Sequence, residues 1–155
     1  RLWAGVISNL DTDSIEWLNT SIKTWPVSVA VSTHWYPRKG SGPTVAHTGF
    51  RSREDEMSAL KAVIKSRPFG VSEFGYHTSS WSSGWGPCKH QHQLSDATVA
   101  EYAQWEWDFW ERVGAEFAVW YQLNDAPAAD SPERFGIRRV SGEWKPVAST
   151  FIKRT

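Results

Sequence analysis

Short apolar runs alternate along the chain with longer segments in which apolar residues recur every three or four positions. The runs at residues 2–8, 27–33, 69–72 and 117–121 have the length and composition of buried strands. The segments after the first three runs, at 15–25, 57–64 and from residue 95 on, have the helical period. This alternation predicts an α/β fold in which four parallel strands lie adjacent in chain order, with helices on the outer face.

Helix boundaries are indicated by capping residues and prolines. Asp11 or Asp13 can cap the first helix, and Pro26 is expected to stop it. Ser52, three residues before Asp55, resembles the start of a capping box. Lys145-Pro146 predicts the start of a short last helix, since proline is favoured in the first turn.

Polar and aromatic residues follow each predicted strand. They are Ser8-Asn9, His34-Trp35-Tyr36, Glu73-Phe74-Gly75-Tyr76-His77, and Trp120 with Gln122, Asn124 and Asp125. The carboxyl ends of parallel strands meet at one edge of the sheet, which is where α/β proteins bind ligands. The sequence therefore predicts a ligand site at this edge, with the Glu73 carboxylate at its rim.

The ordered motifs HWYP, SEFGY, WYQLND and ERFGI, followed by a turn and KP, resemble strands six, seven and eight of retaining β-glycosidases with a (β/α)8 barrel. The first run, LWAGVIS, then falls at strand five. In that clan the catalytic glutamates lie on strands four and seven. The resemblance implies a (β/α)4 half of a TIM barrel spanning residues 1–155 as one domain.

The resemblance also implies roles for individual residues. Glu73 matches the nucleophile, and His34 and Tyr36 match residues that orient the nucleophile and contact sugar hydroxyls. Trp120 matches the aromatic on which a sugar ring stacks, and Trp35 and Tyr76 are expected to contact substrate at the same strand ends. We expect His34, Tyr36, Glu73 and Trp120 to converge, with Tyr36 within hydrogen-bond reach of Glu73.

The acid/base glutamate of the clan follows an Asn on strand four, which would lie upstream of this chain. Retaining hydrolysis needs two carboxyl groups about 5–5.5 Å apart. Most other Asp and Glu residues fall in predicted helices, so Asp125 is the only candidate within the chain, although it matches no acid/base position of the clan. Two hypotheses follow: a glycosidase when the other half is supplied, or a catalytically silent assembly or sugar-binding module.

A half barrel would leave its inner face and both sheet edges uncovered. The sequence therefore predicts a homodimer or a complementary half barrel as partner, beside a carbohydrate ligand. Lys and Arg number 17, as do Asp and Glu, so no net charge favours nucleic acid or a membrane surface. No apolar run has the length of a membrane span and no signal peptide is recognised, so we expect a soluble chain; a single cysteine, Cys88, leaves its compartment open.

Several features also have a structural explanation. Glu73 could be a buried ion-pair partner, and His34 and Tyr36 could be polar groups of the core. The helix from residue 95 has more than one apolar stripe, which indicates burial on two sides, although eleven Trp residues in the chain could also present ring surfaces to a sugar. Cys88, His90 and His92 have no established metal-ligand spacing, so we expect neither a metal nor a cofactor. We interpret residues 79–93, which include Trp81 and Trp85, as a loop at the rim of the cleft.

Overall fold

The computed structural model describes residues 2–7, 9–37, 42–78, 94–127 and 134–152. In chain order its elements are β1 (Trp3–Ile7), α1 (Thr12–Ser21), the 3₁₀ helix η1 (Ile22–Thr24), β2 (Ala30–Trp35), α2 (Arg53–Ile64), β3 (Phe69–Phe74), α3 (Asp96–Arg112), β4 (Ala118–Trp120) and α4 (Ala148–Ile152). None of the helices in these ranges has both the length and the apolar character that a bilayer crossing requires.

The strands form one sheet in the order β1-β2-β3-β4. β1 pairs with β2 in parallel, with Trp3 opposite Ala30, and β2 pairs with β3 in parallel, with Val31 opposite Phe69. The Val71 amide donates a hydrogen bond of 2.9 Å to the carbonyl of Phe117, at the start of the β4 segment. The α/β fold with strands adjacent in chain order is therefore confirmed.

β2 and β3 each end two residues later than the sequence predicted. β2 begins at Ala30 rather than near residue 27, because the Val29 amide closes a turn onto the Pro26 carbonyl at 3.0 Å. At the other end the pairing of Trp35 with Phe74 extends both strands. As a result His34, Trp35, Glu73 and Phe74, which were expected just beyond the strand ends, are the last paired residues of the two strands.

The helix starts agree with the predicted caps. The Asp11 carboxylate accepts a hydrogen bond of 2.9 Å from the Ser14 amide at the start of α1. The Ser52 hydroxyl accepts one of 3.1 Å from the Asp55 amide at the start of α2. α1 ends at Ser21 and continues as η1 to Thr24, whose C-cap Trp25 directly precedes Pro26, where the sequence predicted the helix to stop.

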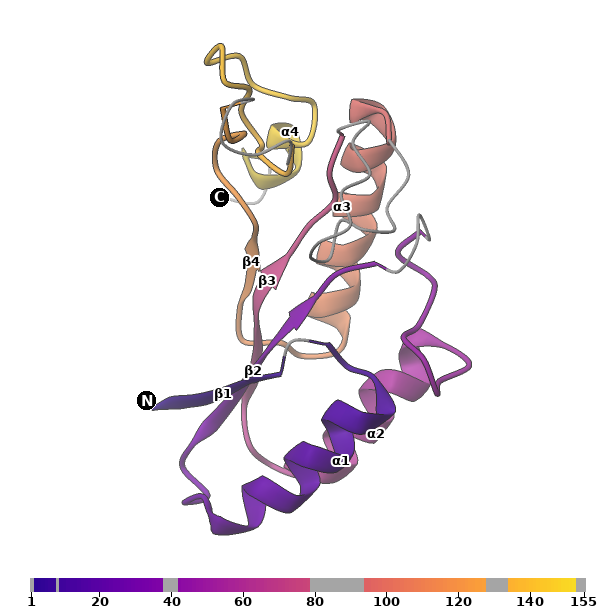
Figure 1. Cartoon of the computed structure of the whole chain (residues 1–155), viewed down its shortest axis with the longest axis vertical. Coiled ribbons are helices and arrows are strands. Elements are labelled where there is room, and N and C mark those ends of the chain that lie inside the picture. The colour runs from indigo at the N-terminus through magenta and orange to yellow at the C-terminus, as the bar shows by residue number, and fades with distance from the viewer. Residues whose placement is uncertain (1, 8, 38–41, 79–93, 128–133, 153–155) are drawn as a thin grey trace. The chain divides into compact units, whose positions relative to one another are not determined.

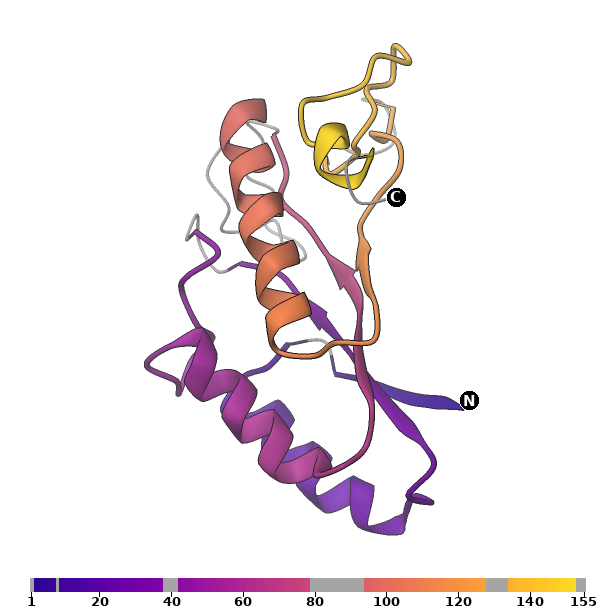
Figure 2. The ribbon, with the colours of Figure 1, turned by 180° about the vertical axis from the view of Figure 1, so that it is seen from behind.

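The described chain divides into two compact units. Unit 1 comprises residues 1–35, 44–74 and 109–119, and unit 2 comprises residues 36–43, 75–108 and 120–155. In unit 1, α1 and α2 lie side by side along one face of β1–β3, as Figure 1 and the reverse view in Figure 2 both show. The assignment of residues 1–155 to one domain stays a prediction.

The strands of unit 1 form a curved sheet. Trp3 on β1 and Phe117 beside β4 belong to the two edges, yet their ring centroids are 4.7 Å apart in an edge-to-face contact. Adjacent strands are about 4.8 Å apart, so three intervals of a flat sheet would separate these edges too widely for such a contact. Phe117 lies directly over Gly70, where an added Cβ would be 2.5 Å from its ring. The absence of a side chain at Gly70 thus admits the aromatic ring onto this face.

Candidate active site

His34 and Glu73 meet at the carboxyl ends of neighbouring parallel strands. The two residues are register partners of β2 and β3, and His34 Nδ1 lies 3.4 Å from Glu73 Oε2. Their side chains are 24% and 36% exposed, so both can reach a ligand from solvent. This pair is the accessible part of the site that the sequence predicted.

An irregularity in the pairing of β2 with β3 places His34 directly opposite Glu73. Between Thr33 and His34 on β2 the partner positions on β3 advance from Val71 to Glu73, which is one residue more. Such bulges redirect side chains and are frequent next to active sites. Without the extra residue, His34 would pair with Ser72 and the carboxylate would lie one position further along.

Two hydroxyl groups reinforce the strands beside this bulge. Thr33 Oγ1 donates to the Ile7 carbonyl at 3.1 Å, which ties β2 to β1. Ser72 Oγ donates to the Thr33 carbonyl at 3.2 Å, which ties β3 to β2. These side-chain bonds compensate for irregular backbone pairing, and nothing in the sequence pattern predicts them beyond the presence of hydroxyl residues in the two strands.

Trp35 lies in the core of unit 1. It is 0% exposed, and the guanidinium carbon of Arg53 lies 3.6 Å from its ring centroid. Successive residues of a strand point to opposite faces, so this burial accompanies the exposure of the neighbouring His34. The predicted contact of Trp35 with a sugar would require an exposed ring face, and in the structure this ring is buried against Arg53.

Tyr36, Tyr76 and Trp120 belong to unit 2 and are buried there. Tyr36 is 8% exposed, and its ring centroid is 5.7 Å from that of Phe135. Tyr76 is 0% exposed and its hydroxyl donates to Glu106 at 2.8 Å. Because Glu73 belongs to unit 1, the convergence of Tyr36 and Trp120 with it stays a prediction.

Trp120 is held by both its ring and its indole nitrogen. Its side chain is 9% exposed and its Nε1 donates to the Phe135 carbonyl at 2.8 Å. Its ring centroid lies 5.8 Å from Phe151 and 6.3 Å from Tyr76. Within unit 2 the indole thus has the contacts of a core residue.

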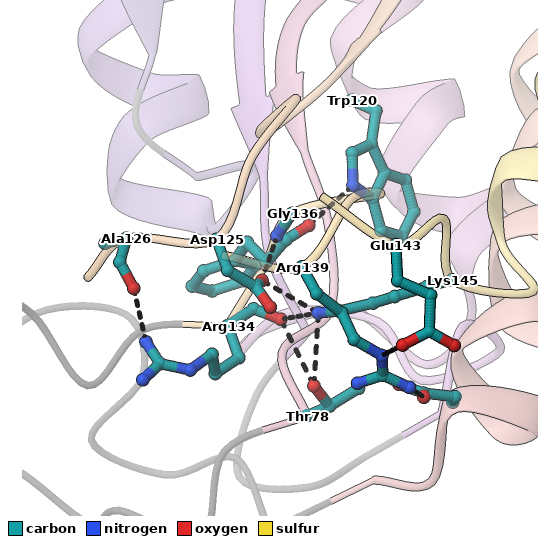
Figure 3. Close-up of polar contacts among 11 residues, drawn as sticks. Thr78, Trp120, Asp125, Ala126, Arg134, Gly136, Arg139, Glu143 and Lys145 are labelled. Carbon is teal, nitrogen blue, oxygen red and sulfur yellow. Dashed lines mark hydrogen bonds and ion pairs between the residues drawn. The ribbon is translucent and has the colours of Figure 1, made fainter. Parts of the chain in front are cut away.

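Asp125 forms a buried ion pair in unit 2. The Lys145 ammonium lies 2.8 Å from Asp125 Oδ1 and also donates to the Arg134 carbonyl at 3.0 Å and the Thr78 hydroxyl at 3.3 Å. The same Asp125 oxygen accepts a bond of 2.9 Å from the Gly136 amide. Figure 3 shows this ammonium group among its oxygen partners. Both charged side chains are nearly inaccessible, at 2% and 4% exposure, so the pair holds the turn after β4 in place.

His77 adds a titratable group to the same unit. It is 0% exposed, and its ring centroid is 5.3 Å from that of Phe135. Burial, and after it the positive charge of Lys145, lowers the pKa of His77 below its ordinary value of 6.5. The imidazole is therefore kept neutral at physiological pH.

A second charged cluster lies in the core of unit 1 and was missed from the sequence. Arg53 and Glu56 are 1% and 0% exposed, with Arg53 Nε 3.2 Å from Glu56 Oε2, and His47 Nδ1 contacts the other carboxylate oxygen. The run Arg53-Glu54-Asp55-Glu56 has the composition of a solvent-exposed first helical turn. For that reason the burial of Arg53 and Glu56 could not be predicted from the sequence. The predicted rim loop, residues 79–93, which includes Cys88, His90 and His92, lies outside the described ranges.

No family model matches the chain, and no curated protein sequence matches it significantly. Solved structures of glycoside hydrolases do match in fold. The GH51 arabinofuranosidase from Xanthomonas axonopodis pv. citri has a TM-score of 0.60 at 15% identity, over 94% of this chain and 33% of that one. An endo-laminarinase from Formosa Hel1_33_131 has a TM-score of 0.58 at 17% identity, over 96% and 46%.

A third match is an active-site mutant of the Rhizomucor miehei β-1,3-glucanosyltransferase in complex with laminaritriose. Its TM-score is 0.52 at 10% identity, over 87% of this chain and 55% of that one. These matches show an α/β fold that corresponds to part of a TIM barrel. It spans about half the length of these structures or less, as a four-stranded part of a barrel would.

Proposed function

We propose that the chain carries the nucleophile of a retaining β-glycosidase, with Glu73 as the attacking carboxylate. The proposal rests chiefly on one observation: Glu73 and His34 meet at 3.4 Å on neighbouring strand ends while remaining partly exposed. The fold shared with glycoside hydrolases supports it, because the carboxyl ends of barrel strands are where such enzymes place their catalytic groups.

In this mechanism a Glu73 oxygen attacks the anomeric carbon of a β-linked sugar. The new carboxylate–carbon bond forms as the bond to the leaving oxygen breaks, and the electron pair departs with that oxygen. His34 would hold the carboxylate in place by its Nδ1 contact. A second carboxyl group must protonate the leaving group and later activate water, and we assign that group to a part of the barrel other than this chain.

Asp125 is a poor candidate for that second carboxyl. Its oxygen already accepts from Lys145 and Gly136, and its side chain is 4% exposed. Removing it from this pair would leave a buried lysine charge without its carboxylate partner, at a cost of about 3–5 kcal/mol. We therefore propose that Asp125 keeps the loop after β4 folded and takes no proton in the reaction.

The burial of the aromatic residues leaves only a small surface for sugar binding among the predicted site residues. Trp35, Tyr76 and Trp120 are buried, so we assign sugar contact first to His34 and Glu73. The same observation favours the second candidate, a catalytically silent half barrel that assembles with a partner or binds sugar weakly. The two candidates differ in whether Glu73 can form a covalent bond.

Labelling with a 2-deoxy-2-fluoro-β-glucosyl donor bearing a dinitrophenolate leaving group tests the proposal. This leaving group departs without protonation, so the missing general acid, which otherwise contributes roughly 10²–10⁴-fold, is not needed. Intact-mass spectrometry should show one added fluorosugar, and peptide mapping should place it on Glu73.

Glu73→Gln is the matched control, since it keeps the size of the side chain and removes the nucleophilic carboxylate. It should take up no label. An unlabelled native chain under conditions in which laminaritriose is seen to bind would favour the silent module. Label on any other residue would contradict the assignment of Glu73.

A further inference from the structure

The buried guanidinium of Arg53 lies in a cage built from three elements of unit 1. Its carbon is 3.6 Å from the ring centroid of Trp35 on β2, and 4.4 and 4.8 Å from those of Phe109 and Trp110 near the end of α3. Glu56 on α2 provides the opposite charge, with Oε2 3.2 Å from Arg53 Nε. One side chain thereby joins a strand end to two helices.

Arginine suits this place for a chemical reason. Its guanidinium is planar and weakly hydrated, so it can stack on aromatic faces while its edge meets a carboxylate. Lysine offers a compact, strongly hydrated charge that stacks poorly and costs more to bury. The cage therefore depends on the shape of the arginine group as well as on its charge.

The cage acts at the point where the backbone ladder is irregular. Regular pairing of β2 with β3 is interrupted between Thr33 and His34, so hydrogen bonding alone leaves the direction of the next residues weakly determined. Trp35, held by Arg53 and packed 6.3 Å from Trp110 between ring centroids, fixes the strand immediately after the bulge. Because neighbouring residues of a strand face opposite ways, His34 is turned to the other side, toward Glu73.

We infer that Arg53 is a positioning residue for the candidate active site. By anchoring Trp35, it sets the direction of His34 and so the contact of His34 with Glu73. The inference rests on the proposed function for its catalytic meaning, but its structural content is independent of any sugar. In this role Arg53 acts on the reacting carboxylate through Trp35 and His34.

The contact can be measured by NMR on the full chain with ¹³C-labelled histidine. Glu73→Gln should shift the His34 ring signal in the native background, because the two side chains touch. In the Arg53→Lys background the shift caused by Glu73→Gln should fall to less than half, since residues that interact through a shared contact are energetically coupled. A uniform loss of stability would not alter this difference.

Arg67→Lys is the matched control. Arg67 also belongs to unit 1, where it donates to the backbone carbonyls of Trp25 at 2.9 Å and Val29 at 3.2 Å, before the start of β2. The coupling between His34 and Glu73 should be undiminished in this variant. If Arg53→Lys fails to fold, Trp35→Phe serves instead, because it keeps an apolar ring but offers the guanidinium a smaller and weaker stacking partner, and it should reduce the coupling as well.

An undiminished coupling in the folded Arg53→Lys or Trp35→Phe chain would overturn the inference. So would the absence of any His34 shift on Glu73→Gln in the native background. Neither result depends on labelling by a fluorosugar. If coupling is present in the native chain and reduced by Arg53→Lys, but the native chain takes up no label, the proposed reaction is contradicted while the positioning role is supported.

Discussion

At the scale of single residues, the same side-chain types have opposite environments in this protein. Glu73 is 36% exposed beside His34, whereas Asp125 is 4% exposed and paired with Lys145. A carboxylate that is to attack a sugar must be reachable, and a buried paired carboxylate stabilises a loop instead. Exposure and partners, and not residue type, separate the candidate nucleophile from the structural acid.

His77 should make the stability of the protein depend on pH. Burial and the charge of Lys145 lower its pKa, so the unfolded chain binds a proton near pH 6.5 while the folded chain still does not. The unfolded state then binds more protons, and stability falls as the pH drops below about 6.5, by at most about 1.4 kcal/mol per pH unit for this one group. Below the lowered pKa of the folded state, both states bind the proton and His77 causes no further decrease in stability.

Urea unfolding at several values between about pH 7.5 and 5 measures this effect. His77→Gln removes the titrating group but keeps a polar side chain, so its unfolding free energy should vary less over this range than that of the native chain. Identical pH dependence in both chains would show that His77 contributes nothing to it.

At the scale of elements, the packing of aromatic side chains on the sheet depends on a position that lacks a side chain. Gly70 on β3 leaves room for the ring of Phe117, which in turn meets Trp3 from the opposite edge. An interior glycine weakens a strand by roughly 0.5–1 kcal/mol relative to alanine. Its presence on β3 therefore has a compensating role, namely to admit an aromatic side chain onto the curved face.

Gly70→Ala should destabilise the protein despite the better strand propensity of alanine. An ideal Cβ would lie 2.5 Å from the Phe117 ring, and overpacking of this kind costs about 1–3 kcal/mol, which exceeds the propensity gain. Adding Phe117→Leu should restore part of the loss, because the shorter side chain vacates the space above residue 70. Thermal and urea unfolding of both variants check this, and a Gly70→Ala chain as stable as the native one would contradict the packing described.

At the scale of the whole molecule, the chain corresponds to part of a larger fold. It aligns with 55%, 33% and 46% of the length of three structures that match it. Leu2, just before β1, and Val119, in β4, are 69% and 48% exposed, so both edges of the sheet offer apolar side chains to solvent. Unpaired edges with exposed apolar residues favour association with another chain.

We therefore expect the isolated chain to form at least a dimer. Apolar burial contributes about 25 cal/mol per Å², so covering several hundred Å² is worth on the order of 10 kcal/mol, comparable to a domain's whole stability of about 5–15 kcal/mol. Sedimentation equilibrium at micromolar concentration should give at least twice the monomer mass of 17.6 kDa. Val119→Lys, which places a charge on one edge, should weaken the association.

A monomer at all concentrations tested would contradict this prediction. The contact of Trp3 with Phe117 would then be part of the reason, because it already covers some of the curved face from within. The test uses no sugar and leaves the assignment of Glu73 unaffected.

The sequence by itself determined the alternation of strands and helices, the caps at Asp11 and Ser52, and the placement of His34 and Glu73 at the ends of neighbouring strands. These features depend on periodicity and on residues a few positions apart, so they can be read along the chain. Only the tertiary structure decided the bulge that aligns His34 with Glu73, the burial of Trp35 against Arg53, and the pairing of Asp125 with Lys145. Each of these depends on packing between segments 18 or more positions apart, where local pattern carries no information about which partners meet.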